Sequence, residues 1–278
     1  MSTSPTLTAL HFYPVKSLAG CTVPEAAVEP WGLAGDRRWM VADADGMMIT
    51  QRQRPRLALA SARLLPGGGV RLTAPGAEAL DVAVPSLAEV EGTVTVQVFR
   101  DKIEAVPAGD AADAWLSAHL GTTARLFHMD EPASRRAIDP DFSLPGETVS
   151  FADGFPLLVT TLASLDAVNA LVARGDLPGE GPLPMNRFRP NAVVGGTEPW
   201  AEDGWRRVRI GEVTFRAVKD CGRCVVTTTD QMTAERGKEP LRSLARHHRI
   251  GGKAVFGKNL IPEHTGTLRV GDTVEILD

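Results

Sequence analysis

The chain has 278 residues, of which 43% are hydrophobic and only 5% aromatic, and its formal net charge is −4. This length suits one large domain or two modest ones. The mildly acidic balance excludes a global basic field, so nucleic acid is not expected as a main partner. Three cysteines are too few for a disulfide framework. No run reaches the ~20 apolar residues of a membrane-spanning helix, and the N-terminus has no signal-peptide core. We therefore expect a soluble, cytoplasmic protein without a membrane partner.

The N-terminal part of the chain, as far as Val106, contains short β-like runs separated by Gly, Pro or Asp residues. The runs on either side of Asp43–Gly46 predict a β-hairpin. Several closely spaced short strands are typical of a barrel or a sandwich. The strands expected here lie at 6–13, 38–42, 48–51, 57–64, 70–73, 80–84, 94–99 and 103–106.

Helical patterns appear only after these strands. Helices are expected at 111–120, at 164–174 and around 240–247, the first two with a glycine at the stop position. The Pro- and charge-rich connector Met129–Glu147 predicts a boundary, so we expect domains at 1–128 and 129–278. The fold class is therefore expected to be mainly β with some helices (α+β). Further strands are expected at 192–194, 208–210, 213–218, 224–229, 268–270 and 273–277.

The sharpest local feature is the sequence KDCGRCVVTTTD at 219–230. Its C-x-x-C spacing occurs in redox pairs and in zinc sites. The β-branched run after Cys224 disfavours the helix start of a redox pair, and zinc would need further ligands. A third interpretation is a single working thiolate, favoured by the neighbouring charges of Arg223 and Lys219. Two buried thiols that act only as small hydrophobic side chains remain an open alternative.

Arginine-rich segments suggest a local anion site despite the acidic total. They follow or precede predicted strands in four places: YPVKS at 13–17, GDRR at 35–38, TQRQRPR at 50–56 and RFRPN at 187–191. Arginine binds phosphate and similar anions through two parallel hydrogen bonds. Each segment alone is weak, because exposed Arg clusters usually only solvate a surface. Together with a Cys on a strand, they predict one convergent anion site.

These segments, in this order, resemble the family that combines a MOSC N-terminal β-barrel domain with a MOSC domain and includes the mitochondrial amidoxime-reducing component. The resemblance extends from about Thr6 to Leu277 and therefore implies two β-barrel-type domains. It is carried by YPVKS at 13–17, GDRRWM at 35–40, MITQRQRPRL at 48–57, FRPN at 188–191, RCVVTT at 223–228 and GTLRVGD at 266–272.

The resemblance implies a cofactor, a molybdenum ion held by a pyranopterin dithiolene, with Cys224 as the protein's metal ligand and catalytic residue. Asp230 is a candidate general acid, because it ends the strand expected to carry Cys224. The residues that the resemblance places around the cofactor are Lys16, Ser17, Arg37, Arg52, Thr161, Ser164, Arg189, Asn191, Gly222 and Arg223.

The family's activity implies an oxidoreductase that reduces N-hydroxylated small molecules, such as amidoximes, hydroxylamines and N-hydroxylated bases. Detoxification and pyridoxal phosphate binding are further associations of the family. The chain has no cysteine cluster for an iron–sulfur centre and no G-x-G-x-x-G fingerprint ahead of a helix. We therefore expect a separate ferredoxin- or cytochrome-type protein, with its reductase, to supply electrons. The alternatives are a sulfur carrier and a protein that binds or transfers the cofactor without turnover.

Overall fold

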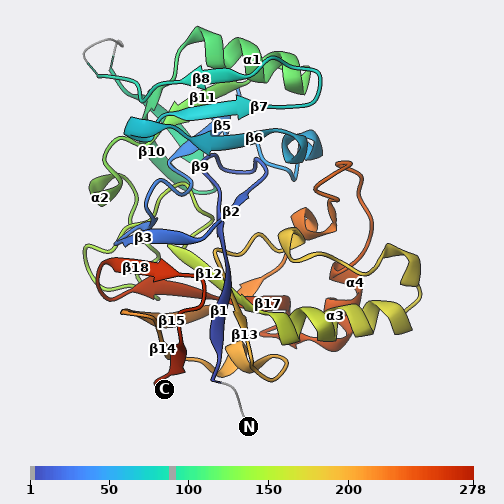
Figure 1. Ribbon diagram of the computed structural model, residues 1–278. Helices are drawn as coiled ribbons and strands as arrows, with labels where there is room; N and C mark the ends of the chain where they lie inside the picture. The colour runs from blue at the N-terminus through green and yellow to red at the C-terminus, as the bar shows by residue number, and fades with distance from the viewer. Residues whose placement is uncertain (1–3, 88–91) are drawn as a thin grey trace.

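The computed structural model describes residues 4–87 and 92–278. The described part is mainly β with four α-helices, which confirms the expected fold class. In Figure 1 one group of strands, with helix α1 (Asp110–Leu120), forms the upper half of the molecule. A larger sheet, flanked by α3 (Leu162–Arg174) and α4 (Leu241–His247), forms the lower half. A single turn of helix, α2 (Pro132–Arg135), lies in the connector.

The larger sheet has nine strands among the described residues and draws them from both ends of the chain. Pairing is antiparallel except between β12 and β13, which α3 connects. The order is β19 (Val274–Ile276), β14 (Arg207–Ile210), β15 (Val213–Gly222), β17 (Lys253–Pro262), β12 (Leu157–Thr161), β13 (Ala192–Gly195), β1 (Thr6–Phe12) and β2 (Cys21–Val23), with β16 (Arg249–Ile250) paired to β17.

This sheet curls far enough for its two ends to meet. Thr6 of β1 forms a bridge with Thr273, just before β19. The Leu7 amide also donates a hydrogen bond of 2.8 Å to the Asp272 carbonyl. The curled sheet encloses an apolar core of side chains such as Leu10, Phe215 and Leu260, all 0% exposed. Because β1 and β2 pair with later strands, the N-terminal residues are part of this sheet.

Smaller sheets make up the rest of the molecule. A four-stranded sheet has the order β5 (Trp39–Ala42), β11 (Arg125–His128), β10 (Asp101–Pro107) and β9 (Val94–Val98). Beside it lie β6 (Ser61–Leu64), β7 (Val70–Thr73) and β8 (Leu80–Val82), and a third sheet joins β18 (Gly266–Arg269), β3 (Glu25–Glu29) and β4 (Gly32–Leu33). Helix α1 and the strands β6–β8 share one apolar core.

Most predicted elements exist, with shifted ends, but three predictions are wrong. The 48–51 run is not a strand, although Met48 does bridge to Ala42 across the predicted turn. Residues 55–59, inside the strand expected at 57–64, form a 3₁₀ helix that begins with Pro55. The strand expected at 224–229 is also absent. Strands β2, β3, β4, β11, β12, β16 and β17 were not predicted at all.

Within residues 4–87 and 92–278, no helix combines the length and the apolar character needed to cross a membrane.

Candidate functional site

A cavity of about 160 Å³ lies where the two halves of the molecule meet. It is lined by the loops that follow β1 and β15 and by those that precede β5, β12 and β13, together with the segment containing Arg52. Its lining comprises Lys16, Ser17, Arg37, Arg52, Ala152, Asp153, Gly154, Phe155, Leu157, Leu158, Phe188, Arg189, Asn191, Cys221, Gly222, Arg223, Cys224, Val226, Thr227 and Asn259.

Nine of the twelve residues singled out from the sequence line this cavity. They come from five separate segments of the chain, which the fold gathers around one space. The nine are Lys16, Ser17, Arg37, Arg52, Arg189, Asn191, Gly222, Arg223 and Cys224; the other three, Thr161, Ser164 and Asp230, lie outside the lining.

A buried carboxylate, Asp36, holds part of the wall together. It accepts hydrogen bonds from the Tyr13 amide (2.7 Å), from Asn191 Nδ2 (3.0 Å) and from Arg37 Nη1 (2.5 Å). Asn191 Oδ1 accepts from the same Arg37 nitrogen at 2.9 Å. Arg37 is thus anchored by a carboxylate and an amide, each of which is almost fully buried. Asp36 was missed by the sequence interpretation, which considered only the arginine of the Asp36-Arg37 pair.

The Tyr13 ring packs against two guanidinium groups. The Arg37 Cζ lies 4.1 Å from its centroid, and the Arg189 Cζ lies 4.4 Å from it. The guanidinium of Arg189 makes no hydrogen bond with any described residue. Burial lowers the pKa of Arg189 to about 10, even though Tyr13 and nearby carboxylates raise it. A charged donor group without a hydrogen-bonding partner is suited to receive an anion.

Backbone strain is concentrated at this cavity. Six non-glycine residues of the described chain have a positive φ, and three of them line the cavity. These are Ser17 (φ 70°), Arg37 (φ 49°) and Arg189 (φ 53°). A positive φ at a residue other than glycine costs of order 1–3 kcal/mol, and this conformation persists where surrounding contacts enforce it. All three residues were predicted from sequence to contact a ligand.

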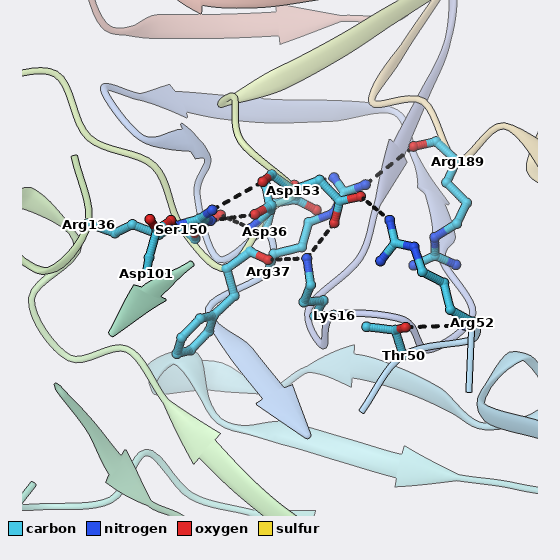
Figure 2. A network of polar contacts seen from close by, with 12 residues as sticks. Lys16, Asp36, Arg37, Thr50, Arg52, Asp101, Arg136, Ser150, Asp153 and Arg189 are labelled. Atoms are coloured by element: carbon cyan, nitrogen blue, oxygen red, sulfur yellow. Dashed lines mark hydrogen bonds and ion pairs between the residues drawn. The ribbon is translucent and has the colours of Figure 1, made fainter. Parts of the chain in front are cut away.

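Lys16 and Asp153 form an ion pair in the cavity wall (Figure 2). Lys16 is 4% exposed, and its Nζ lies 2.5 Å from Asp153 Oδ1 and 2.8 Å from the Phe151 carbonyl. Burial lowers the pKa of Lys16 to about 8, although the Asp153 carboxylate raises it. Desolvation raises the pKa of the Asp153 carboxyl, but the opposite effect of Lys16 and Arg52 is larger. These two cations hold this pKa well below its usual range. Asp153 therefore stays ionised at neutral pH, and the sequence interpretation did not include it.

A buried arginine from the connector fixes the loop that carries Asp153. Arg136 donates hydrogen bonds to the carbonyls of Ser150 (3.1 Å), Ala152 (2.5 Å) and Asp153 (3.1 Å). Its Nε donates to Asp101 at 2.7 Å, as Figure 2 shows. The three bonds to carbonyls hold the loop by its backbone and leave the Asp153 carboxylate free to face the cavity, and the fourth anchors Arg136 to Asp101.

The segment that carries Cys224 differs from its predicted strand. Cys224 precedes a 3₁₀ turn at Val225–Thr228. Two hydroxyl groups support this turn: Thr227 Oγ1 donates to the Cys224 carbonyl, and Thr228 Oγ1 to the Val225 carbonyl, both at 2.9 Å. Threonine can bond in this way to a carbonyl three residues earlier, and this local bonding competes with strand formation.

The charge next to Cys224 also comes from an unexpected residue. Arg223 points to the other thiol, with Nη1 2.8 Å from Cys221 Sγ. Lys219 lies over the Phe142 ring, 4.0 Å from its centroid. Arg52 takes their place beside Cys224: burial lowers the pKa of Arg52, but Asp153 and a hydrogen bond with Cys224 raise it more. Arg223 and Lys219 thus contact other groups, and the cation beside Cys224 comes from a residue distant in sequence.

Cys221 shares the cavity with Cys224 but has a different environment. Burial raises its thiol pKa, and the effect of Arg223 in lowering it is smaller. At neutral pH Cys221 is therefore the protonated thiol. No group of three or more His, Cys, Asp or Glu side chains suited to hold a metal occurs among the described residues. A structural zinc site therefore has no ligand set there.

Thr161 and Ser164 belong to a separate polar cluster. Thr161 caps α3 by accepting a hydrogen bond of 3.1 Å from the Ser164 amide. Both hydroxyls donate to the buried carboxylate of Glu202, at 3.1 and 2.8 Å. Their hydrogen bonds are therefore made at the start of α3 and to Glu202, and neither residue lines the cavity.

The Asp230 carboxylate is engaged in local hydrogen bonds and an ion pair. Its carboxylate accepts hydrogen bonds from the amides of Met232 and Thr233 and pairs with Arg187 Nη2 at 2.8 Å. The Met232 amide is the leading cause that lowers the pKa of Asp230. An ionised carboxylate outside the cavity has no proton to donate, so this arrangement argues against the expected acid role.

A second cavity, of about 980 Å³, adjoins the first. The two share the stretches 153–155 and 221–223 and the side chain of Asn259. The larger cavity adds apolar residues, among them Phe99, Ile138 and Pro140, and several charged ones. It provides space for a small molecule directly beside the cationic cavity.

Comparisons with known proteins cover nearly the whole chain. The model of the MOSC N-terminal beta barrel domain matches residues 4–123, and that of the MOSC domain matches residues 146–275. The human protein named mitochondrial amidoxime-reducing component 1 is 32% identical over 289 residues, which cover 98% of this chain and 83% of the human one.

Two further relatives carry different names. Rat mitochondrial amidoxime reducing component 2 is 33% identical, covering 97% of this chain and 82% of the rat one. A molybdenum cofactor sulfurase from Danio rerio is also 33% identical; the match covers 91% of this chain but only 31% of that protein. The chain therefore belongs to the MOSC family, with a MOSC N-terminal β-barrel domain ahead of its MOSC domain.

Proposed function

We propose that the smaller cavity binds a molybdenum–pyranopterin cofactor and that the protein is an oxidoreductase that reduces N-hydroxylated compounds. The observation that carries this proposal is the charge of the cavity. Five cationic side chains line it (Lys16, Arg37, Arg52, Arg189 and Arg223) against one carboxylate, Asp153. This excess of positive charge fits a phosphate-bearing, anionic cofactor. The names of the relatives support the choice of cofactor.

The residues present fit such a group. Cys224 offers a sulfur atom, which is a soft ligand for a transition metal, and Arg52 is hydrogen-bonded to this side chain. Arg189 offers a guanidinium without a hydrogen-bonding partner, and Lys16 and Ser17 lie on the same wall. Arg223 and Gly222 line the cavity between the two cysteines.

When bound, the cofactor would supply the two-electron chemistry that cleaves the N–O bond. An amidoxime plus two electrons and two protons yields an amidine and water. The chain's own part is to orient substrate and cofactor and to supply charge in a partly buried site. Lys16, whose pKa is about 8, holds a proton at Nζ near neutral pH, and the ionised Asp153 fixes its position.

Electrons would come from a separate ferredoxin- or cytochrome-type carrier protein with its reductase. Gly68, the centre of the glycine run, lies in a turn between β6 and β7 and not at the start of a dinucleotide-binding helix. We propose a cytoplasmic setting for this exchange.

A second candidate is a sulfur carrier or a protein that transfers the cofactor without turnover. It is favoured by the second thiol, Cys221, whose Sγ lies 2.8 Å from Arg223. The relative named molybdenum cofactor sulfurase also fits this alternative.

Turnover separates the two candidates. Protein purified from a host that makes the cofactor is given benzamidoxime and chemically reduced viologen, and benzamidine is measured. Steady formation of benzamidine supports the reductase, whereas molybdenum-loaded protein that forms none supports the carrier. NADH alone should not sustain the reaction, but adding a ferredoxin- or cytochrome-type carrier with its reductase should restore it.

A further inference from the structure

The turn between β9 and β10 contains an aromatic residue where glycine is expected. Val98 pairs with Asp101, so Phe99 and Arg100 form a two-residue hairpin turn. Of these two, only Phe99 has a positive φ, of 55°. This pattern is typical of a type II′ turn, whose first central position favours glycine because a side chain there is strained. A bulky ring at this position needs a reason other than turn formation.

The Phe99 side chain stands where the two cavities adjoin. It lines the larger cavity and is 38% exposed. Lys16 Nζ lies 5.5 Å from its ring centroid and Arg52 Cζ lies 5.0 Å from it, and both of these residues line the smaller cavity. The ring is thus positioned by cationic residues of the proposed cofactor site and is partly free toward the larger space.

A second ring lines the same cavity from the other half of the chain. Phe155 belongs to both linings and is packed edge-on against Phe142, with 5.8 Å between centroids and an interplanar angle of 83°. Ile138 and Pro140 add apolar surface. Flat aromatic groups pack well against such surfaces.

We propose that Phe99 is a specificity-determining residue: its ring forms the wall that selects N-hydroxylated substrates that carry the N–OH group on a substituent of a planar aromatic ring. The aromatic part of the substrate would lie in the larger cavity and the N–OH group would face the smaller one. This inference rests on the proposed function, since it names the substrate class of the same site.

The test compares four forms of the full-length, cofactor-loaded protein: wild type, Phe99→Gly, Phe99→Leu and Phe99→Trp. The measured quantity is the ratio of kcat/KM for benzamidoxime to kcat/KM for hydroxylamine, which has no ring. The ratio should fall roughly two- to tenfold in Phe99→Gly and Phe99→Leu, mainly through KM, and recover in Phe99→Trp. An unchanged ratio in Phe99→Gly overturns the inference.

A stability readout separates selection from a structural role. Glycine relieves the strained turn, so Phe99→Gly should keep or raise the Tm and should retain its molybdenum. A lowered Tm with loss of molybdenum would show instead that the ring only supports Lys16 and Arg52. Ala234→Gly is the matched control, because Ala234 has a φ of 60° and lines neither cavity. It should change Tm in the same direction and leave the ratio unchanged.

Direct binding distinguishes failure of this inference from failure of the proposed function. Benzamidoxime binding is measured by ligand-observed NMR in wild type and Phe99→Gly, without any electron donor. If benzamidoxime binding depends on Phe99 but no turnover occurs, the reductase function is contradicted and the role of Phe99 as an aromatic wall is supported. Turnover of benzamidoxime together with equal binding in both forms supports the reductase function and contradicts the aromatic wall.

Discussion

The Lys16 ammonium lies 2.5 Å from Asp153 Oδ1 at the wall of a cavity rich in positive charge. Burial and this partner together set the pKa of Lys16 to about 8, below its ordinary 10.5. Lys16 therefore changes charge within an accessible pH range.

Cofactor retention should weaken as pH rises through about 8, because Lys16 then loses the charge that attracts an anion. Molybdenum kept by the protein after gel filtration at a series of pH values measures this. Lys16→Arg keeps its charge and should flatten the dependence. If Lys16→Met retains the wild-type pH dependence, Lys16 is not its source.

Stability of the cofactor-free protein should depend on pH in the opposite direction. Folded Lys16 binds its proton more weakly than an unfolded lysine does, so the free energy of unfolding should rise as pH increases between about 8 and 10.5. The contribution of this group is on the order of 3 kcal/mol. Chemical denaturation across this range measures it, and Lys16→Met should remove most of the slope. A slope that is unaltered in that variant would contradict the shifted pKa.

Arg187 and Arg189 should differ sharply although only one residue separates them. Arg187 is buried and bonds to the Thr228 carbonyl and to Asp230, so Arg187→Ala should lower the free energy of unfolding by about 1–3 kcal/mol. Arg189 makes no such bonds, so Arg189→Ala should retain stability but lose cofactor roughly tenfold or more in affinity. Thermal unfolding and metal analysis of both variants measure this. If Arg189→Ala loses stability but keeps its molybdenum, Arg189 is a structural residue and does not bind the cofactor.

Asp230→Asn should leave the pH profile of kcat unchanged, because the Asp230 carboxylate is already ionised and outside the cavity. Loss of its pairing with Arg187 should instead lower the free energy of unfolding by about 1 kcal/mol. Rates with reduced viologen across the pH range, together with a melting curve, measure both effects. If an inflection in the pH profile of kcat disappears in this variant, Asp230 is the general acid.

The residues of the site were predicted more fully than their contacts. Short motifs identified Lys16, Arg189 and Cys224, because the type of residue and its position beside or within an expected strand are visible in sequence. The cationic partner of Cys224 was not predictable in this way. Arg52 approaches it only through the packing of the two halves of the molecule, whereas Arg223, its sequence neighbour, turns to Cys221.

The fold shows the same division between local and long-range information. Helix α3 was predicted from its apolar stripe and its glycine stop, which are local signals. Strand β17 was missed because Gly257, with a φ of 84°, interrupts a run that already contains charged residues. Its pairing with both β12 and β15 holds it in the sheet. The strand expected after Cys224 failed because threonine hydroxyls bond to nearby carbonyls there.

The molybdenum content of three proteins tests the central claim most directly: wild type, Cys221→Ser and Cys224→Ser, each purified from a host that makes the cofactor. Both cysteines line the cavity and lie three positions apart, so each variant is the matched control for the other. Wild type and Cys221→Ser should carry close to one molybdenum per chain, and Cys224→Ser should lose most of it. Equal molybdenum in both variants, or loss only in Cys221→Ser, would contradict Cys224 as the metal ligand.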